Sequence, residues 1–109
     1  MSTNLQVSLE RRVLRVELNR PEKRNALSLA MCRDLIEAFD RAERDAAIGA
    51  VLLTATGSVF CAGMDLDEAL EGSAAEHNRL HRELFTAGAR MTTPVVAAVS
   101  GPALGGGVG

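Results

Sequence analysis

The first part of the chain alternates apolar and polar residues, which is the pattern of half-buried β-strands. In the segments LQVSLE and RVLRVELN, the apolar residues Leu14, Val16 and Leu18 share one parity, so they would face one side of a sheet. We predict a hairpin that turns around Glu10 and Arg11. The second strand should end at the Asn-Arg-Pro that follows, because proline removes a donor from the strand ladder.

Helical spacing replaces this alternation after residue 28. The apolar residues that recur on one helical face are Cys32, Leu35, Ile36, Phe39 and Ala42. Ser28 precedes them and can cap a helix, since a serine oxygen accepts from the free N–H groups of a first turn. Leu80, Leu84, Ala87 and Met91 share the apolar face of a later segment. That second helix should end near Thr93, because Pro94 disfavours helix in the residue before it.

Two short apolar segments complete the pattern. AVLLTAT starts at Ala50 and PVVAAVS at Pro94, and we predict that both form buried strands. The order is two strands, helix, strand, helix, strand and the start of a further helix. This alternation indicates an α/β protein with right-handed crossovers and a largely parallel sheet. No repeat or linker divides the chain, so we expect residues 1–109 to form a single domain.

Composition narrows the classes of partner. The chain has 109 residues, of which 47% are hydrophobic and 24% charged, with a formal net charge of -2. Basic residues are interspersed with acids and there is no aromatic platform, which argues against a nucleic-acid partner. No apolar run approaches the roughly 20 residues that span a bilayer, so we expect no membrane segment. Cys32 and Cys61 form no CxxC pair and no cleavable leader is evident, so we expect a reduced, cytoplasmic protein.

Three loops follow the predicted strands, where ligands of parallel sheets gather: NRPEKRNALS, GSVFCAGMDL and GPALGGGVG. In the second loop Ala62 and Gly63 carry little side chain, so a ligand can approach the backbone of Gly63, Met64 and Asp65. Asp65 can also cap a following helix, and N–H groups at a helix start suit an oxygen that becomes negative.

The third loop repeats this arrangement with the glycine triplet that begins at Gly105. Without Cβ atoms, its N–H groups can face a ligand, and two such loops could converge on one oxygen as an oxyanion hole. The alternative for either loop alone is that glycine only permits tight packing of a helix against a strand. A phosphate-binding P-loop is disfavoured, because the required Lys-Ser or Lys-Thr is missing after the last glycine.

The segments NRPEKRNALS, FCAGMDL and PVVAAVSGPALGGGVG, in this order and at these separations, resemble the enoyl-CoA hydratase/isomerase (crotonase) superfamily. The resemblance covers essentially the whole chain but only the N-terminal portion of a typical member. It implies a crotonase-like spiral of ββα turns that ends before the C-terminal helical region. It also implies an acyl-CoA substrate and assembly as a homotrimer or a dimer of trimers.

The same resemblance implies roles for individual residues. The backbone N–H groups of Met64 and Gly106 would hold the thioester carbonyl oxygen and stabilise the charge of its enolate. We expect Gly63, Asp65 and Gly105 to contact the substrate beside them.

The resemblance also implies a site for coenzyme A. A basic residue of the first loop, Lys23 or Arg24, would pair with CoA phosphates, a contact that suits arginine well. The backbone around Ala26, and later around Ala62 and Leu66, would contact the rest of CoA. The alternative for Lys23 and Arg24 is a solvated loop.

The activity implied by the resemblance is hydration or isomerisation of an enoyl-CoA, with no cofactor besides the coenzyme A of the substrate. Many hydratases of this family carry a catalytic Glu three residues after the second oxyanion-hole glycine, where this chain has Gly109. Hydration by a glutamate pair is therefore in doubt. A thioester hydrolase, a dehalogenase and a non-catalytic CoA-binding or assembly protein are the alternatives.

Other titratable residues receive simpler explanations. An imidazole has a suitable pKa to supply the missing acid-base group, so a catalytic His81 is an alternative, but a lone histidine on a polar helix face is usually solvated and we expect His81 on the surface. His77 and His81 have zincin spacing, yet Asn78 replaces the required Glu, so we expect no metal site. The acids from Asp65 onward fit a helix start, and Cys61 fits a small packing residue.

Overall fold

The structure, a computed structural model, describes residues 4–109. Its strands are β1 (Leu5–Glu10), β2 (Val13–Leu18), β3 (Ala50–Ala55) and β4 (Val95–Ala97). Its α-helices are α1 (Leu29–Arg44), α2 (Leu66–Glu71) and α3 (Ala74–Ala89), and two 3-10 turns are η1 (Pro21–Lys23) and η2 (Gly105–Gly107). The predicted glycine-rich helix start is thus a single 3-10 turn.

The strands form one sheet in the order β1-β2-β3-β4. β1 and β2 pair antiparallel as the predicted hairpin, whereas β2 with β3 and β3 with β4 pair parallel. Each parallel pair is joined through helices, α1 in the first crossover and α2 with α3 in the second. The expected α/β class and largely parallel sheet are confirmed.

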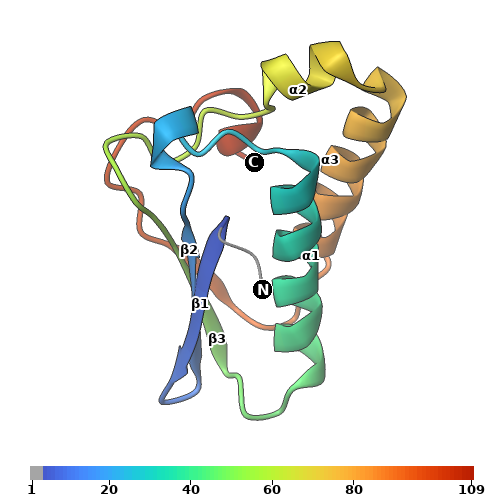
Figure 1. The fold of residues 1–109 in the computed structure, drawn as a ribbon. Helices are drawn as coiled ribbons and strands as arrows, with labels where there is room; N and C mark the ends of the chain where they lie inside the picture. The colour runs from blue at the N-terminus through green and yellow to red at the C-terminus, as the bar shows by residue number, and fades with distance from the viewer. Residues whose placement is uncertain (1–3) are drawn as a thin grey trace.

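The helices α1 and α3 lie side by side on one face of the sheet (Figure 1). The core between these layers is apolar, and its buried residues include Leu14, Val16 and Leu18 of β2, Met31, Leu35 and Phe39 of α1, and Leu80 and Leu84 of α3. The parity of β2 and the apolar faces of both helices are therefore the ones that the sequence predicts.

Side-chain caps fix where two helices begin. Ser28 Oγ accepts from the Met31 N–H at 3.2 Å, and Asp65 Oδ1 accepts from the Glu68 N–H at 3.2 Å. Both caps were predicted, and each satisfies a donor that the first helical turn cannot pair internally. The second cap places the start of α2 immediately after Met64.

The predicted burial of the last two strands is wrong. Only Val51 of β3 is buried, and β4 is an exposed edge strand in which Val96 is 59% exposed. Apolar side chains of β3 and β4 point to both faces of the sheet, but α1 and α3 cover only one of these faces (Figure 1). Within residues 4–109 no helix lies on the opposite face. In the same part of the chain, no helix is long and apolar enough to cross a membrane.

A carboxylate joins the end of α1 to the segment that leads into β4. Glu43 accepts from the N–H groups of Thr93 at 2.8 Å and Thr92 at 3.0 Å, and from the Thr92 hydroxyl at 2.9 Å. These bonds, led by the Thr93 N–H, lower the pKa of Glu43 from 4.5 to about 2. Because the folded pKa is depressed, the charge stabilises the fold above pH 4.5, and this contribution is lost as the pH falls toward 2.

We predict that Glu43→Gln lowers the free energy of unfolding at pH 7 and that its deficit relative to the wild type shrinks as the pH falls below about 4.5. Urea unfolding followed from pH 7 to pH 3 measures the difference. Glu37→Gln, an exposed change on the same helix, is the matched control and should show a pH-independent difference. A Glu43→Gln deficit that stays constant over this range would contradict the assignment.

Candidate active site

The first and second motif loops lie side by side through backbone hydrogen bonds. The Leu27 N–H donates to the Gly63 carbonyl at 2.7 Å, and the Asp65 N–H donates to the Leu27 carbonyl at 3.1 Å. Leu27 and Met64 therefore form a parallel bridge. In such a bridge the N–H and the carbonyl of Leu27 pair with Gly63 and Asp65, the residues on either side of Met64. The N–H of Met64 itself therefore points away from the first loop.

The third loop pairs with the other edge of the second. The Phe60 N–H donates to the Pro102 carbonyl at 2.9 Å, and the Leu104 N–H donates to the Cys61 carbonyl at 2.9 Å. Cys61 and Ala103 form a parallel bridge as a result. The three motifs are therefore neighbours in the order first, second, third, so the loops converge as the sequence indicated.

Two glycines permit this approach. A Cβ on Gly63, which has φ 92°, would lie 2.8 Å from the Leu104 carbonyl oxygen and 3.1 Å from the Gly106 nitrogen. A Cβ on Gly107 would overlap the Cys61 carbonyl. Close packing thus explains both glycines, and the same packing brings the backbone at Gly106 up to the second loop. The structural and the functional interpretation of these glycines are compatible.

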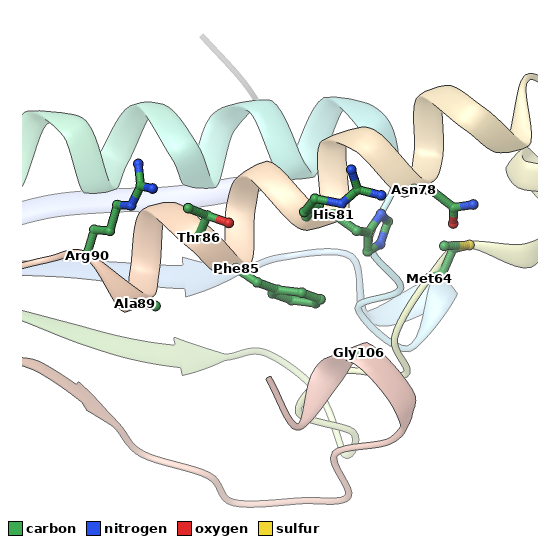
Figure 2. Close-up of a pocket in the computed structure, with 9 residues that line it drawn as sticks. Met64, Asn78, His81, Phe85, Thr86, Ala89, Arg90 and Gly106 are labelled. Carbon is green, nitrogen blue, oxygen red and sulfur yellow. The ribbon is translucent and has the colours of Figure 1, made fainter.

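Met64 and Gly106 both line one cleft of about 720 Å³ (Figure 2). Both residues are half-buried. Neither N–H has a hydrogen-bond acceptor among residues 4–109. Two residues of one cleft thus carry backbone donors without an internal partner, and such donors are suited to an oxygen acceptor.

The opposite wall of the cleft is one face of α3. It carries Asn78, His81 and Phe85, and Arg90 caps its C-terminal end. The rings of His81 and Phe85 point toward the loops with Met64 and Gly106 (Figure 2). The prediction of a solvated His81 is wrong, because its side chain is only 6% exposed. The helix turns this histidine toward the core, next to Leu80 and Leu84, although the surrounding residues are charged.

Two buried thiols lie behind the cleft. Cys32 Sγ lies 4.0 Å from both ring nitrogens of His81, and burial raises the pKa of this thiol to about 11. Cys61 donates to the Asn25 carbonyl at 3.3 Å, and burial raises its pKa as well. Both cysteines are therefore neutral near pH 7, which fits packing rather than nucleophilic attack.

Asn25 holds the first loop in place. Its side chain is fully buried, accepts from the Arg20 N–H at 2.7 Å, and donates to the Thr56 and Val59 carbonyls, each at 2.8 Å. Its φ of 54° lies in the left-handed region, which asparagine tolerates. One amide therefore ties the first loop to the segment that enters the second.

A buried ion pair adds to this connection. The Arg20 guanidinium donates to the Ala26 carbonyl at 2.5 Å and to Asp65 Oδ2 at 3.1 Å. Burial raises the pKa of Asp65, but the hydrogen bond from Glu68 and the bond and charge of Arg20 outweigh burial and leave that pKa below its usual value. The Asp65 carboxylate is therefore ionised near neutral pH and is fully occupied by the fold.

The other residues predicted to bind substrate or CoA lie outside the cleft, some of them exposed and some half-buried. Lys23, Arg24 and Leu66 are exposed, and Leu66 is 68% exposed. Ala26 and Ala62 are half-buried between the first and second loops, where the Ala62 N–H donates to the Arg24 carbonyl at 3.0 Å. Gly105 is exposed at the start of η2. None of these residues lines the cleft at Met64 and Gly106, so any role in binding CoA requires a neighbouring surface.

Sequence reasoning missed Arg20, Asn25, Glu68 and His77 as parts of the site. Glu68 accepts from the Leu29 N–H at 2.8 Å and lies 3.5 Å from the fully buried His77 ring. Each of these contacts joins residues far apart in the sequence, so local spacing gives no sign of them. In the described part of the chain, no group of three His, Cys, Asp or Glu residues could hold a metal ion.

The family model described as "Enoyl-CoA hydratase/isomerase" matches residues 8–109. The enoyl-CoA hydratase EchA19 of Mycobacterium tuberculosis is 40% identical over 107 residues, which cover 91% of this chain and 40% of that protein. The 4-chlorobenzoyl coenzyme A dehalogenase-2 of Arthrobacter sp is 41% identical over 104 residues, which cover 89% of this chain and 38% of that protein.

Structural similarity agrees with these matches. The crystal structure of an enoyl-CoA hydratase from Bacillus anthracis superposes with a TM-score of 0.90 at 32% identity, over 95% of this chain and 42% of that one. The chain spans between 32% and 40% of the length of the curated relatives it matches.

We predict that Asn25→Asp lowers the free energy of unfolding at pH 7 by about 2 kcal/mol or more, because the carbonyls of Thr56 and Val59 lose their donor and face a buried carboxylate. Aspartate keeps the size of asparagine and its tolerance of a positive φ, so the change isolates the lost donors. Urea unfolding measures the effect. Asn78→Asp, an exposed residue at the rim of the cleft, is the control and should stay within about 0.5 kcal/mol of the wild type. An equally small effect at Asn25 would contradict its role.

Proposed function

This chain belongs to the enoyl-CoA hydratase/isomerase family, and we propose that it stabilises the enolate of an acyl-CoA thioester between the backbone N–H groups of Met64 and Gly106. The observation that carries this proposal is the pair of unpaired donors at one cleft. Backbone donors fixed in place before the reaction need no reorganisation when charge develops, and losing one typically costs about 2.7 to 4 kcal/mol of transition-state stabilisation.

The reaction class that fits best is hydration or isomerisation of an enoyl-CoA. Both reactions pass charge onto the thioester oxygen, so both use the same two donors. The family membership supports this class, while the choice between the two reactions depends on the acid-base group. Gly109 provides no side chain for that purpose.

In this proposal coenzyme A would bind on the surface beside the cleft. The exposed Lys23 and Arg24 are available to pair with CoA phosphates, and the backbone around Ala26, Ala62 and Leu66 would contact the remainder. Arg82 and Arg90 line the cleft itself and add positive charge there. The reaction would need no cofactor beyond the coenzyme A of the substrate. The protein would act in the cytoplasm as a homotrimer or a dimer of trimers.

A second candidate is removal of halogen from an aryl-CoA thioester. The observation that favours it is the 41% identity to a protein named 4-chlorobenzoyl coenzyme A dehalogenase-2. This reaction also benefits from a polarised thioester carbonyl, so the same two N–H groups would serve it. Release of chloride from 4-chlorobenzoyl-CoA distinguishes it from enoyl-CoA chemistry.

The proposed function predicts turnover of crotonyl-CoA or of a 3-enoyl-CoA by the protein, followed by the absorbance of the conjugated thioester. A crotonyl-CoA signal that falls indicates hydration, and a 3-enoyl-CoA signal that rises indicates isomerisation. Binding of these thioesters without turnover would favour a CoA-binding or assembly protein instead. Absence of both binding and turnover for every CoA thioester, 4-chlorobenzoyl-CoA included, would refute the proposal.

We predict that Gly63→Ala lowers kcat/KM by about 10² to 10³, the usual effect of losing one oxyanion-hole donor. The new Cβ would meet the Leu104 carbonyl oxygen at 2.8 Å and the Gly106 nitrogen at 3.1 Å, so the loops must move apart. The matched control is Gly49→Ala, whose Cβ would meet Arg12 at an ordinary 3.5 Å. Steady-state kinetics compares the two variants. Equal kcat/KM values for the folded variants would contradict the role of the loop approach.

A further inference from the structure

The N–H of Met64 is the end of a series of hydrogen bonds that begins at a buried guanidinium. Arg20 Nη1 donates to the Ala26 carbonyl at 2.5 Å. The next residue, Leu27, donates its N–H to the Gly63 carbonyl at 2.7 Å. The Ala26 carbonyl and the Leu27 N–H belong to one peptide group. The Gly63 carbonyl and the Met64 N–H belong to a second one. We call this series of two bonds and two peptide groups the relay.

The bonds of the relay all run in one direction. Both peptide bonds are trans, so the carbonyl and the N–H of each planar group point opposite ways. Each group accepts a bond at its carbonyl, on the side of Arg20, and carries its N–H on the side away from Arg20. The direction of the Met64 N–H is therefore fixed by the bond that its own peptide group accepts from Leu27.

A positive charge at the start of the relay strengthens the donor at its end. The guanidinium draws electron density toward the Ala26 oxygen, which leaves more positive charge on the Leu27 hydrogen. The second peptide group responds in the same way to the Leu27 N–H. Hydrogen bonds in series polarise one another by roughly 10 to 30% per bond. The Met64 N–H is thus a stronger donor to a negative oxygen than an isolated peptide N–H.

Arg20 is held in place at the start of the relay. Its side chain is only 14% exposed, and its second nitrogen donates to Asp65 Oδ2 at 3.1 Å. Its backbone N–H donates to Asn25 Oδ1 at 2.7 Å. Because Asp65 directly follows Met64, the same guanidinium holds the chain on both sides of the bridge between Leu27 and Met64. Arginine suits this double contact, since its planar fork presents several donors in fixed directions.

The second candidate donor has no such relay. The Gly106 N–H shares its peptide group with the Gly105 carbonyl, which accepts from the Val108 N–H at 3.2 Å within η2. That bond is longer than either bond of the relay, and it starts from a neutral N–H. The two donors of the candidate site therefore differ in strength, and the stronger one belongs to Met64.

We propose that Arg20 is a positioning residue that orients and polarises the Met64 N–H through the relay, and so raises its affinity for a negatively charged oxygen. The inference rests on the proposed function, in which that oxygen belongs to the thioester enolate. Arg20 does not line the cleft, so it acts only through the two peptide groups. The competing explanation is that Arg20 merely joins the loops. Its loss would then weaken the binding of neutral and of charged ligands equally.

The test variant combines Arg20→Gln with Asp65→Asn. It removes both charges of the buried pair, so neither is left unpaired in the interior, and asparagine can still cap α2. The matched control combines Arg15→Gln with Glu17→Gln, which replaces an ion pair of β2 by amides in the same way. In that pair Arg15 Nη2 lies 3.5 Å from Glu17 Oε2, and the arginine side chain is 56% exposed.

Amide proton shifts of the free protein test the relay without any ligand. A weaker hydrogen bond moves an amide proton upfield, so we expect an upfield shift at Leu27 in the test variant and none in the control. Leu104 donates to the Cys61 carbonyl at 2.9 Å outside the relay and should keep its shift in both. An unchanged Leu27 shift would overturn the relay. Loss of the folded state would overturn it as well, because the ion pair would then serve only the fold.

Two CoA thioesters test what the relay does. Butyryl-CoA offers a neutral carbonyl oxygen, whereas acetoacetyl-CoA can lose a proton to form an enolate, which is followed by its ultraviolet absorbance. We expect the test variant to bind the enolate about 10 to 100 times more weakly than the wild type, a smaller effect than the loss of a whole donor. Its affinity for butyryl-CoA should change little. The control should match the wild type for both ligands.

The inference and the proposed function can fail separately. Equal losses for both ligands, or an unchanged affinity for the enolate, would overturn the role of Arg20 and leave the oxyanion site standing. A wild type that binds neither ligand would overturn the proposed function together with the inference. The same conclusion would follow from a wild type that binds the enolate no more tightly than butyryl-CoA.

Discussion

The structure depends on one constraint, which is that residues 60–65 pair with a neighbouring backbone on both sides at once. Leu27 forms the bridge on one side and Ala103 on the other. Such close pairing is possible only where side chains are missing, as at Gly63 and Gly107. The parallel bridge to Leu27 uses the backbone groups of Gly63 and Asp65, so the N–H of Met64 stays unpaired, and the N–H of Gly106 also has no acceptor among residues 4–109. The same contacts that close the fold thus expose the candidate donors.

A chain of polar contacts connects this pairing to the helices that form the far wall of the cleft. Arg20 holds Asp65, which caps α2, and Glu68 in the first turn of α2 accepts from the first N–H of α1. Glu68 also lies beside His77 of α3. Removing one partner would leave a buried charge or donor unpaired, which costs more than the net gain from the bond itself. The orientation of α3, and with it His81, is therefore coupled to the motif loops.

Much of the fold follows from local pattern. The hairpin, the two long helices and the caps at Ser28 and Asp65 were predicted from spacing and residue type, and the structure confirms them. The crotonase-like fold implied by three ordered motifs is confirmed by a TM-score of 0.90 to a hydratase of this family. Local pattern fails where burial is decided by distant elements. PVVAAVS has the composition of a buried strand, yet β4 is an exposed edge because the helices cover the other face.

The candidate site, like the fold, is predictable from local pattern only in part. Motif glycines mark the loops, because glycine is needed wherever backbones approach closely, and the loops do converge. The burial of Asn25 and of His81 was not predictable, since it depends on partners remote in sequence. The charged residues around His81 indicate a solvated helix face, and only the packing of α3 against α1 buries the ring. The roles of Met64 and Gly106 in binding remain predictions.

The most direct test of the central claim is a crystal structure of the protein with a bound, unreactive acyl-CoA thioester, in which the position of the thioester carbonyl oxygen is measured. The account predicts that this oxygen lies about 2.7 to 3.1 Å from both the Met64 and the Gly106 backbone nitrogens. A thioester bound with its carbonyl oxygen beyond hydrogen-bond distance of both nitrogens would contradict the account.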